Sequence, residues 1–308
     1  MKKQLILFFC LLLSAYAVMA QPPDTASTMV HYKFSHLRDT TKPENPYTEN
    51  MMLLLGKKST AYKSYDARLA ALDAKKQMQE QMAANGGNGP IRINMKKSGS
   101  GTEYYLFPVE SKLIRKEKLI NSYLIDEPFP VINWQISTDT ATFGGLHCQK
   151  ATARFKGRDY TAWFCPDIPF HGGPWKLSGL PGLILEAFDT KKQVVFKFDG
   201  VEDISKMAAP AKPANDDAQP PGGIRLIGMD AADEDPRLIT LPTDAIKTTE
   251  SEFAKLKEAM HKDPNAFLQS AMAGSGANMS PNGPQMHMSF KPGPQPVENN
   301  PIELPEKK

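Results

Sequence analysis

The sequence is poor in cysteine and lacks the short motifs that mark many catalytic and metal sites. It has three cysteines among 308 residues, and none is spaced as Cys-x-x-Cys. There is no Gly-x-Ser-x-Gly elbow, no His-Glu-x-x-His pair and no phosphate-binding glycine loop. These absences leave no positive signal for a preformed metal site, a thioredoxin-type redox centre, a zinc protease, an α/β-hydrolase or a P-loop enzyme. The sequence therefore assigns no cofactor, no metal and no catalytic residue.

An excess of charge of either sign is also missing. The formal net charge is +3, from 37 basic and 34 acidic residues. Residues 1–20 contain two lysines and no acidic residue, so the rest of the chain has 35 basic and 34 acidic residues and a net charge of +1. This near balance gives no indication of nucleic acid or an anionic membrane as a partner.

Long apolar runs are confined to the first 20 residues. Two lysines precede an apolar run from Leu5 to Leu13, and small residues follow it up to Ala20. That pattern is typical of a cleaved secretory signal peptide. The run is shorter than the roughly 20 residues that a transmembrane helix needs, and Cys10 lies inside it, which argues against a lipoprotein. The sequence predicts export to the periplasm or beyond, with no transmembrane segment after signal removal.

What remains predicts one folded unit with an unstructured end. Residues 21–269 have the length of a single β-rich domain. Within them, the Pro- and Asp-containing stretch 210–223 predicts a mobile loop. Residues 270–308 are rich in Met, Pro, Gly and Asn and poor in large apolar residues. They predict a largely disordered tail.

Alternating and apolar segments predict many strands and two helices. The predicted strands are 29–37, 51–55, 59–62, 104–107, 111–118, 120–125, 131–137, 148–155, 159–165, 183–188, 194–198 and 238–241. Helices are predicted over 66–84, with Asp66 as its N-cap, and over 243–262, followed by Pro264. The fold class is α+β, mainly antiparallel, as an open barrel or strongly curved sheet with both helices packed against it. A two-sheet sandwich is the alternative.

The most tightly specified stretch is a structural motif made of Gly179, Leu180, Pro181, Gly182, Leu183 and Ile184. Pro181 sets φ for the second position of a β-turn, and Gly182 supplies the positive φ that a type II turn needs at its third. The apolar residues from Leu183 to Leu185 predict a strand buried on both faces. None of these side chains can transfer a proton, so we expect the motif to shape a scaffold.

The two cysteines outside the predicted signal peptide fall on one predicted hairpin. A two-residue turn at Lys156-Gly157 would place Arg154 opposite Asp159. The same register places Cys148 opposite Cys165. In an oxidising compartment, two cysteines facing each other across strands should form a disulfide.

Two alternatives give the protein an active chemistry. Asp167, His171 and Ser178 contain the residue types of a hydrolytic triad within one short stretch. The alternative to that function is a structural role for each of them, as turn residues that bond nearby backbone. If the triad were functional, the protein would be an envelope hydrolase using residues near His171.

The second alternative is soft-metal handling through the tail. Thioether and imidazole groups suit copper(I), and the tail contains Met279, Met286, His287 and Met288. Methionine is also a general filler of irregular gaps, so its presence is not specific. A metal role in the tail is an alternative to a simple unstructured end.

Several short segments of the sequence resemble one family of secreted bacterial proteins. These segments are Gly179 to Ile184, Cys148 to Ala151, Phe155 to Tyr160, Ala162 to Phe164, Ile168 to Trp175 and Asn299 to Leu304. Taken in their order along the chain, these segments resemble the GLPGLI family over most of its length. The resemblance implies an envelope protein, largely β, with no established activity and no agreed catalytic residues. The leading expectation is therefore an exported non-catalytic protein that binds an envelope protein or an apolar ligand.

Overall fold

The computed structural model describes residues 23–84, 99–207, 235–274 and 297–306. The predicted signal peptide at 1–20 and the predicted loop at 210–223 lie outside these ranges. The tail segment that holds Met279, Met286, His287 and Met288 lies outside them too.

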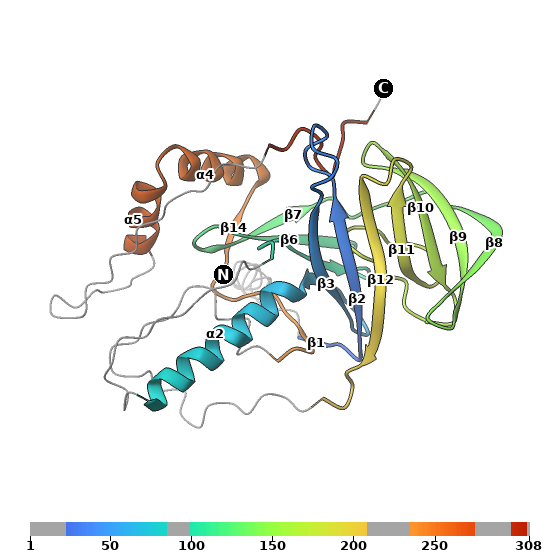
Figure 1. Cartoon of the computed structure of the whole chain (residues 1–308), viewed down its shortest axis with the longest axis horizontal. Coiled ribbons are helices and arrows are strands. Elements are labelled where there is room, and N and C mark those ends of the chain that lie inside the picture. The colour runs from blue at the N-terminus through green and yellow to red at the C-terminus, as the bar shows by residue number, and fades with distance from the viewer. Residues whose placement is uncertain (1–22, 85–98, 208–234, 275–296, 307–308) are drawn as a thin grey trace, which may run out of the picture.

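One sheet of twelve strands organises the fold, in the order β14-β7-β6-β5-β4-β3-β2-β12-β11-β10-β9-β8 (Figure 1). Its strands are β2 (Thr28–His36), β3 (Tyr47–Leu55), β4 (Thr60–Ser64), β5 (Glu103–Phe107), β6 (Lys112–Lys118), β7 (Ser122–Glu127), β8 (Gln135–Phe143), β9 (Leu146–Phe155), β10 (Arg158–Cys165), β11 (Leu183–Asp189), β12 (Val194–Asp203) and β14 (Ile246–Thr248). Neighbours are antiparallel except β14 and β7, which run parallel. A separate antiparallel pair joins β1 (Asp24–Thr25) to β13 (Leu238–Ile239).

The large sheet is strongly curved. In Figure 1, β2, β3 and β12 stand in the centre, β8 to β11 wrap to one side, and β6, β7 and β14 extend to the other. The sheet does not close into a barrel, because β14 and β8 are its two ends. The predicted α+β class with a dominant antiparallel sheet is confirmed. Twelve strands share one hydrogen-bonded sheet, which differs from the two sheets of the alternative sandwich.

The centre of the sheet is buried on both faces. Along β3, Leu53 and Leu55 belong to a core cluster that also contains residues of β9 to β12, whereas Met52 and Leu54 belong to a second cluster on the other face. All four are at most 4% exposed. A strand covered on both sides needs apolar residues at consecutive positions, which explains the unbroken run in β3.

The helices differ from the prediction in number and in their starts. α2 (Tyr65–Ala84) is preceded by Ser64, whose Oγ accepts a hydrogen bond from the Ala67 amide at 3.0 Å. The predicted cap, Asp66, instead accepts hydrogen bonds from the backbone and side-chain amides of Asn50 in β3. The carboxylate thus ties the helix to the sheet rather than closing its first turn.

The second predicted helix begins later than expected and is followed by a third. β14 occupies part of the predicted helical range, so α4 (Glu250–Lys262) starts after Thr249, which forms a capping box with Glu252. α4 ends at Lys262 as predicted, and the Pro264 that follows it opens a further helix, α5 (Pro264–Gly274). Phe253 of α4 packs on Tyr123 of β7, with ring centroids 5.6 Å apart.

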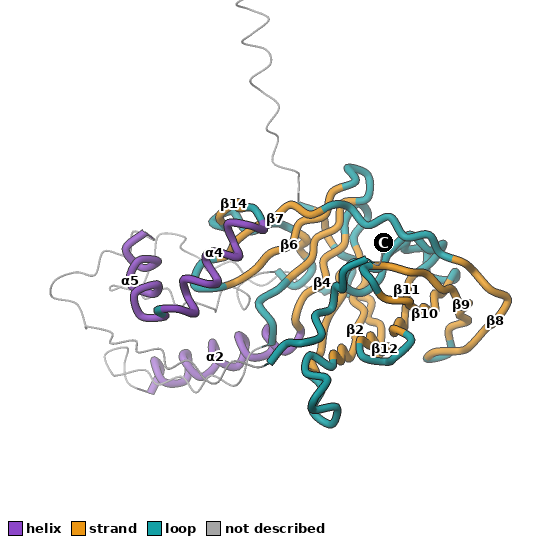
Figure 2. The backbone as a smooth tube through the Cα atoms, turned by 90° about the horizontal axis from the view of Figure 1, so that it is seen from above, coloured by secondary structure: helices purple, strands orange, loops and turns teal. Residues whose placement is uncertain are grey.

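All three helices lie on the side of the molecule away from β8 to β11 (Figure 2): α4 and α5 beside β14 and β7, and α2 starting against β3. This leaves the β8 end of the sheet without a helix from the described ranges. Within the same ranges, no helix combines the length and the hydropathy that crossing a membrane would require.

Candidate functional site

The predicted bend at Pro181-Gly182 is present, but it is tighter than a type II turn. The Gly182 amide donates to the Leu180 carbonyl at 2.9 Å, which closes a three-residue turn around Pro181. Gly182 has φ 151°, far from the value near +80° of a type II turn. The strand that follows is buried as expected, since Leu183, Ile184 and Leu185 are fully inaccessible.

Gly182 is required by a close approach of backbone to backbone. A Cβ at this position would lie 2.3 Å from the carbonyl oxygen of Cys165. Gly179, in the same motif, has φ 91°, and a Cβ there would meet no atom within 4 Å. The two glycines therefore serve different needs: Gly182 gives the bend room to sit on the end of β10, and Gly179 supplies only a left-handed backbone.

The hairpin of β9 and β10 has the predicted register. Lys156 and Gly157 form its two-residue turn with φ of 48° and 72°, and Phe155 pairs with Arg158. Arg154 lies opposite Asp159, and Arg154 Nη1 is 3.1 Å from Asp159 Oδ1. This part of the prediction is confirmed.

The two cysteines of this hairpin are buried, free thiols in the structure. The last pair in the ladder of β9 and β10 joins Gln149 to Phe164, so Cys148 and Cys165 are next to it on their strands. Cys148 Sγ donates to the Leu146 carbonyl at 3.7 Å. Burial raises the pKa of Cys148 to about 12, and the neighbouring Cys165 thiol adds to the increase. The predicted disulfide is not formed in the structure, although the pair that would make it is side by side.

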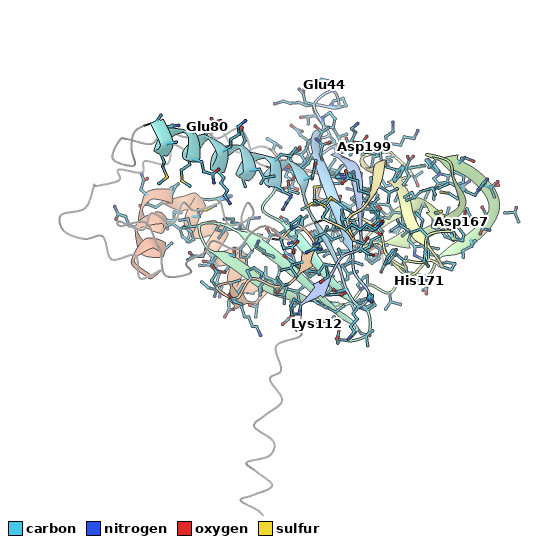
Figure 3. The ribbon with its side chains drawn as sticks, turned by 90° about the horizontal axis from the view of Figure 1, so that it is seen from below. Glu44, Glu80, Lys112, Asp167, His171 and Asp199 are labelled. Carbon is cyan, nitrogen blue, oxygen red and sulfur yellow. The ribbon has the colours of Figure 1, made fainter. Side chains whose placement is uncertain are left out.

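The residue types of a hydrolytic triad have separate structural partners. His171 Nδ1 is 3.1 Å from the Leu180 carbonyl, within the Pro-Gly region. Asp167 lies near His147, with 3.9 Å between Oδ2 and Nδ1, and both side chains are mostly exposed. Ser178 is buried, and its carbonyl accepts from Trp134 Nε1 at 2.9 Å. Figure 3 marks Asp167 and His171 at the same end of the molecule. No hydrogen bond or ion pair joins these three among the described residues, and His171 bonds nearby backbone as a turn residue would.

Sequence reasoning missed the most heavily bonded side chain of this region, Arg158. Its guanidinium donates to the Asp189 carboxylate at 2.8 Å, to the Asn300 side chain at 2.8 Å, and to the carbonyls of Pro301 and Ile302 at 2.7 and 2.9 Å. The side chains of Arg158 and Asp189 are only 3% and 5% exposed. A buried guanidinium needs this many acceptors because leaving its charge unpaired would lower the free energy of unfolding by about 3 kcal/mol or more.

The acceptors of Arg158 come largely from the C-terminal segment, which we define as residues 299–306. Its start is held by the amides of Asn299 and Asn300, which both donate to the Arg38 carbonyl at 3.0 Å. Further along, the Leu304 amide donates to the Lys156 carbonyl at 3.0 Å. The prediction of a disordered tail is therefore wrong for this segment, because hydrogen bonds hold it where composition gave no sign of a core.

Ion pairs add to the hold on the C-terminal segment. Glu303 contacts Lys176 at 2.5 Å and Lys156 at 3.0 Å, and Glu306 contacts Arg154 at 3.2 Å. Burial alone would raise the pKa of Glu303, but the two lysines hold it below its usual range. Two of the sequence segments, 155–160 and 299–304, thus meet around Arg158. We call this set of hydrogen bonds and ion pairs, which holds the C-terminal segment on the hairpin, the clasp.

β8 is an end strand of the sheet (Figure 2), so one of its sides has no neighbouring strand to take up backbone hydrogen bonds. Its nine residues are all exposed or half-exposed. Gly144 and Gly145 have φ of 55° and 85° and make a two-residue turn, with Phe143 paired to Leu146. Such a turn makes its closing pair a hydrogen-bonded one, and pairs then alternate along an antiparallel ladder.

That alternation decides which backbone groups of β8 are free. Thr142 and Thr140 pair with His147 and Gln149 at the non-hydrogen-bonded positions of the ladder. Their N–H and C=O groups therefore point away from β9, toward the unoccupied side. Before Thr140 the register shifts, and Lys150 of β9 holds Asp139 through an ion pair of 2.9 Å. The regular open edge is thus limited to residues 140–143.

The described residues contain no group of three or more His, Cys, Asp or Glu side chains arranged to hold a metal ion. The Met and His residues of the tail lie outside them, so the copper(I) alternative stays a hypothesis. Among the predicted site residues, the structure brings the bend against Cys165 and places Cys148 next to the same end of the hairpin. The C-terminal segment meets the hairpin at its other end, around Arg158.

Comparison with known proteins adds a family of unknown function. Residues 154–186 match the family described as "Protein of unknown function (Porph_ging)". That range includes the Gly179 to Ile184 motif. The matched family is not the GLPGLI family that the sequence segments indicate, so the match supports only likeness to a family without an assigned function. No curated protein matches the chain.

Two solved structures of PNGF-II are similar at a low level. One, in the P21 space group, has a TM-score of 0.44 and 11% identity and covers 75% of this chain and 32% of that chain. The other, in the C2 space group, has a TM-score of 0.44 and 10% identity and covers 74% of this chain and 32% of that one. The present chain therefore spans about a third of those proteins, and no activity is carried over from them.

Proposed function

We propose that this is an exported, non-catalytic protein of the cell envelope, with one domain over residues 21–269, that binds a protein partner along β8. The observation that carries the proposal is the outward direction of the backbone groups of Thr140 and Thr142 at the end of the sheet. An extended segment of a partner could pair with them and add a strand. The signal-peptide pattern of residues 1–20 supports the exported, envelope part of this proposal.

A partner is favoured over an apolar ligand because β8 offers directional hydrogen-bonding groups at an exposed position. The other end of the sheet offers less, since β14 has only three residues and β8 has nine. The register shift and Asp139 are devices that limit uncontrolled pairing of sheet edges. They leave a short template at residues 140–143, which suits a selective contact.

The hydrolase alternative has less support. Among the described residues, the His171 side chain bonds to the Leu180 carbonyl, Asp167 lies near His147, and no contact joins either of them to the Ser178 hydroxyl. General base catalysis needs the base within about 3 Å of the proton that it removes. Nothing in the described region aligns these groups for a common reaction.

The proposal is tested by removing one outward amide. Thr142→Pro deletes the N–H that would bond a partner, and proline is tolerated where an edge N–H faces solvent. Thr142→Val keeps the amide and the strand propensity, so it is the matched control. Each protein is immobilised and used to capture binding proteins from the envelope of its own source, and urea unfolding shows that both variants fold.

We expect the wild type and Thr142→Val to retain the same partner and Thr142→Pro to lose it. Equal capture by all three proteins would overturn the edge proposal. So would the recovery of a lipid alone, because a lipid does not need the Thr142 amide.

A further inference from the structure

The register of the β9 and β10 hairpin fixes the geometry of the Cys148 and Cys165 pair. The two-residue turn makes Phe155 and Arg158 a hydrogen-bonded pair, and the pairs alternate from there. Counting along the ladder, Gln149 and Phe164 are hydrogen-bonded, so Cys148 and Cys165 fall at a non-hydrogen-bonded position. There, opposite Cα atoms are about 4.5 Å apart and side chains are closest. That spacing is within the range that a disulfide spans.

The neighbouring ladder supports this count independently. Around Gly144-Gly145, Phe143 and Leu146 are hydrogen-bonded, and Ala141 with Cys148 is the next hydrogen-bonded pair. A residue inside a sheet bonds to one neighbouring strand and not to the other. Cys148 therefore directs its backbone groups to β8, which leaves it non-hydrogen-bonded toward β10, as the first count requires.

Access to the pair is closed by the packing around it. Cys148 and Cys165 are 2% and 0% exposed. The bend sits directly on Cys165, because a Cβ on Gly182 would touch the Cys165 carbonyl and the Ile168 amide donates to that same carbonyl at 3.3 Å. Phe143 of β8 and Trp163 of β10 pack together with ring centroids 5.9 Å apart and lie against the core cluster that contains both cysteines.

We infer that Cys148 and Cys165 become a cross-strand disulfide by exchange with an external disulfide while the chain is folding, and that the folded chain no longer admits the oxidant. One cysteine thiolate attacks the external disulfide, forms a mixed disulfide and releases one thiol. The second thiolate then attacks the protein sulfur of the mixed disulfide and releases the second thiol. Two protein thiols are oxidised and one external disulfide is reduced to two thiols.

Burial of the thiols implies that oxidation comes before folding is complete. Exchange needs a thiolate and an unobstructed approach to sulfur. With its pKa raised from 9.0 to about 12, Cys148 in the folded chain has about 1000-fold less thiolate than an unperturbed cysteine at neutral pH. Before residues 166–182 pack over Cys165, neither restriction applies.

The test compares oxidation during folding with oxidation after it. Cys10→Ser in the full chain leaves Cys148 and Cys165 as the only thiols. In one arm, reduced and denatured protein is diluted into buffer that contains oxidised and reduced glutathione. In the other arm, the protein first folds with reductant, is desalted, and then receives the same glutathione mixture. Samples are denatured, alkylated with iodoacetamide and weighed by mass spectrometry.

We expect no alkyl group on protein folded with glutathione. Protein that folded first should keep two alkyl groups, with oxidation at least about 100-fold slower, and urea should restore rapid oxidation. Two alkyl groups in the first arm would overturn the disulfide. Equal oxidation rates in both arms would overturn the order of events.

Discussion

Arg158 and Asp189 form a buried ion pair that joins the β9 and β10 hairpin to the turn after β11. Arg158 Nη1 lies 2.8 Å from Asp189 Oδ2. The other carboxylate oxygen of Asp189 accepts from the backbone amides of Gln193 and Val194 at 2.6 and 2.9 Å. The carboxylate thus fixes the turn between β11 and β12, while the guanidinium fixes the C-terminal segment. One pair therefore orders two regions that are distant in the sequence.

Loss of Arg158 should destabilise the protein far more than loss of an exposed arginine on the same hairpin. Arg158→Ala leaves Asp189 buried without its counter-charge, which costs about 3–5 kcal/mol of unfolding free energy. Arg154→Ala is the control: Arg154 also contacts the C-terminal segment through Glu306, but it is 42% exposed, and its loss should cost about 1 kcal/mol or less. Urea unfolding of both variants provides the comparison. Losses of equal size would show that the buried pair is not what holds the segment.

The two glycines of the central motif should respond differently to alanine. Gly182→Ala forces a Cβ to within 2.3 Å of the Cys165 carbonyl, so backbone has to move and the cost should exceed about 3 kcal/mol. Gly179→Ala meets no atom within 4 Å and should cost about 1–2 kcal/mol from its left-handed backbone alone. Thermal and urea unfolding measure both. A larger loss for Gly179→Ala would mean that φ, not close approach, explains the motif.

Local sequence rules predicted the parts of the site that depend on neighbouring residues. The Lys156-Gly157 turn fixed the register of β9 and β10, and with it the Arg154 and Asp159 pair, because a two-residue turn leaves little freedom in pairing. The Pro181-Gly182 bend was predicted for the same kind of reason. Its type was not, since the need for glycine comes from the carbonyl of Cys165, which only the folded chain brings close.

The clasp around Arg158 could not be predicted in this way. An arginine after a hairpin turn has the pattern of an exposed charge, and its partner Asp189 is 31 residues away. The C-terminal segment has few large apolar residues. Composition indicates how much apolar surface a segment can bury, but not whether it will hydrogen-bond to a buried guanidinium. The family match covers residues 154–186 and does not reach the C-terminal segment, so it indicated neither the contact nor its chemistry.

Acid should lower the free energy of unfolding by a defined amount through protonation of Glu103 in β5. Burial alone would raise the pKa of Glu103, but Lys63 and Lys116 lower it from 4.5 to about 2. Below pH 4.5 the unfolded chain takes up the proton first, so about 3 kcal/mol that is present above pH 5 is lost as the pH falls toward 2. Urea unfolding across this range should show that loss in wild type and a flatter profile in Glu103→Gln. Glu110→Gln, at an exposed position of the turn before β6, should keep the wild-type slope, and a Glu103→Gln profile as steep as wild type would contradict the assignment.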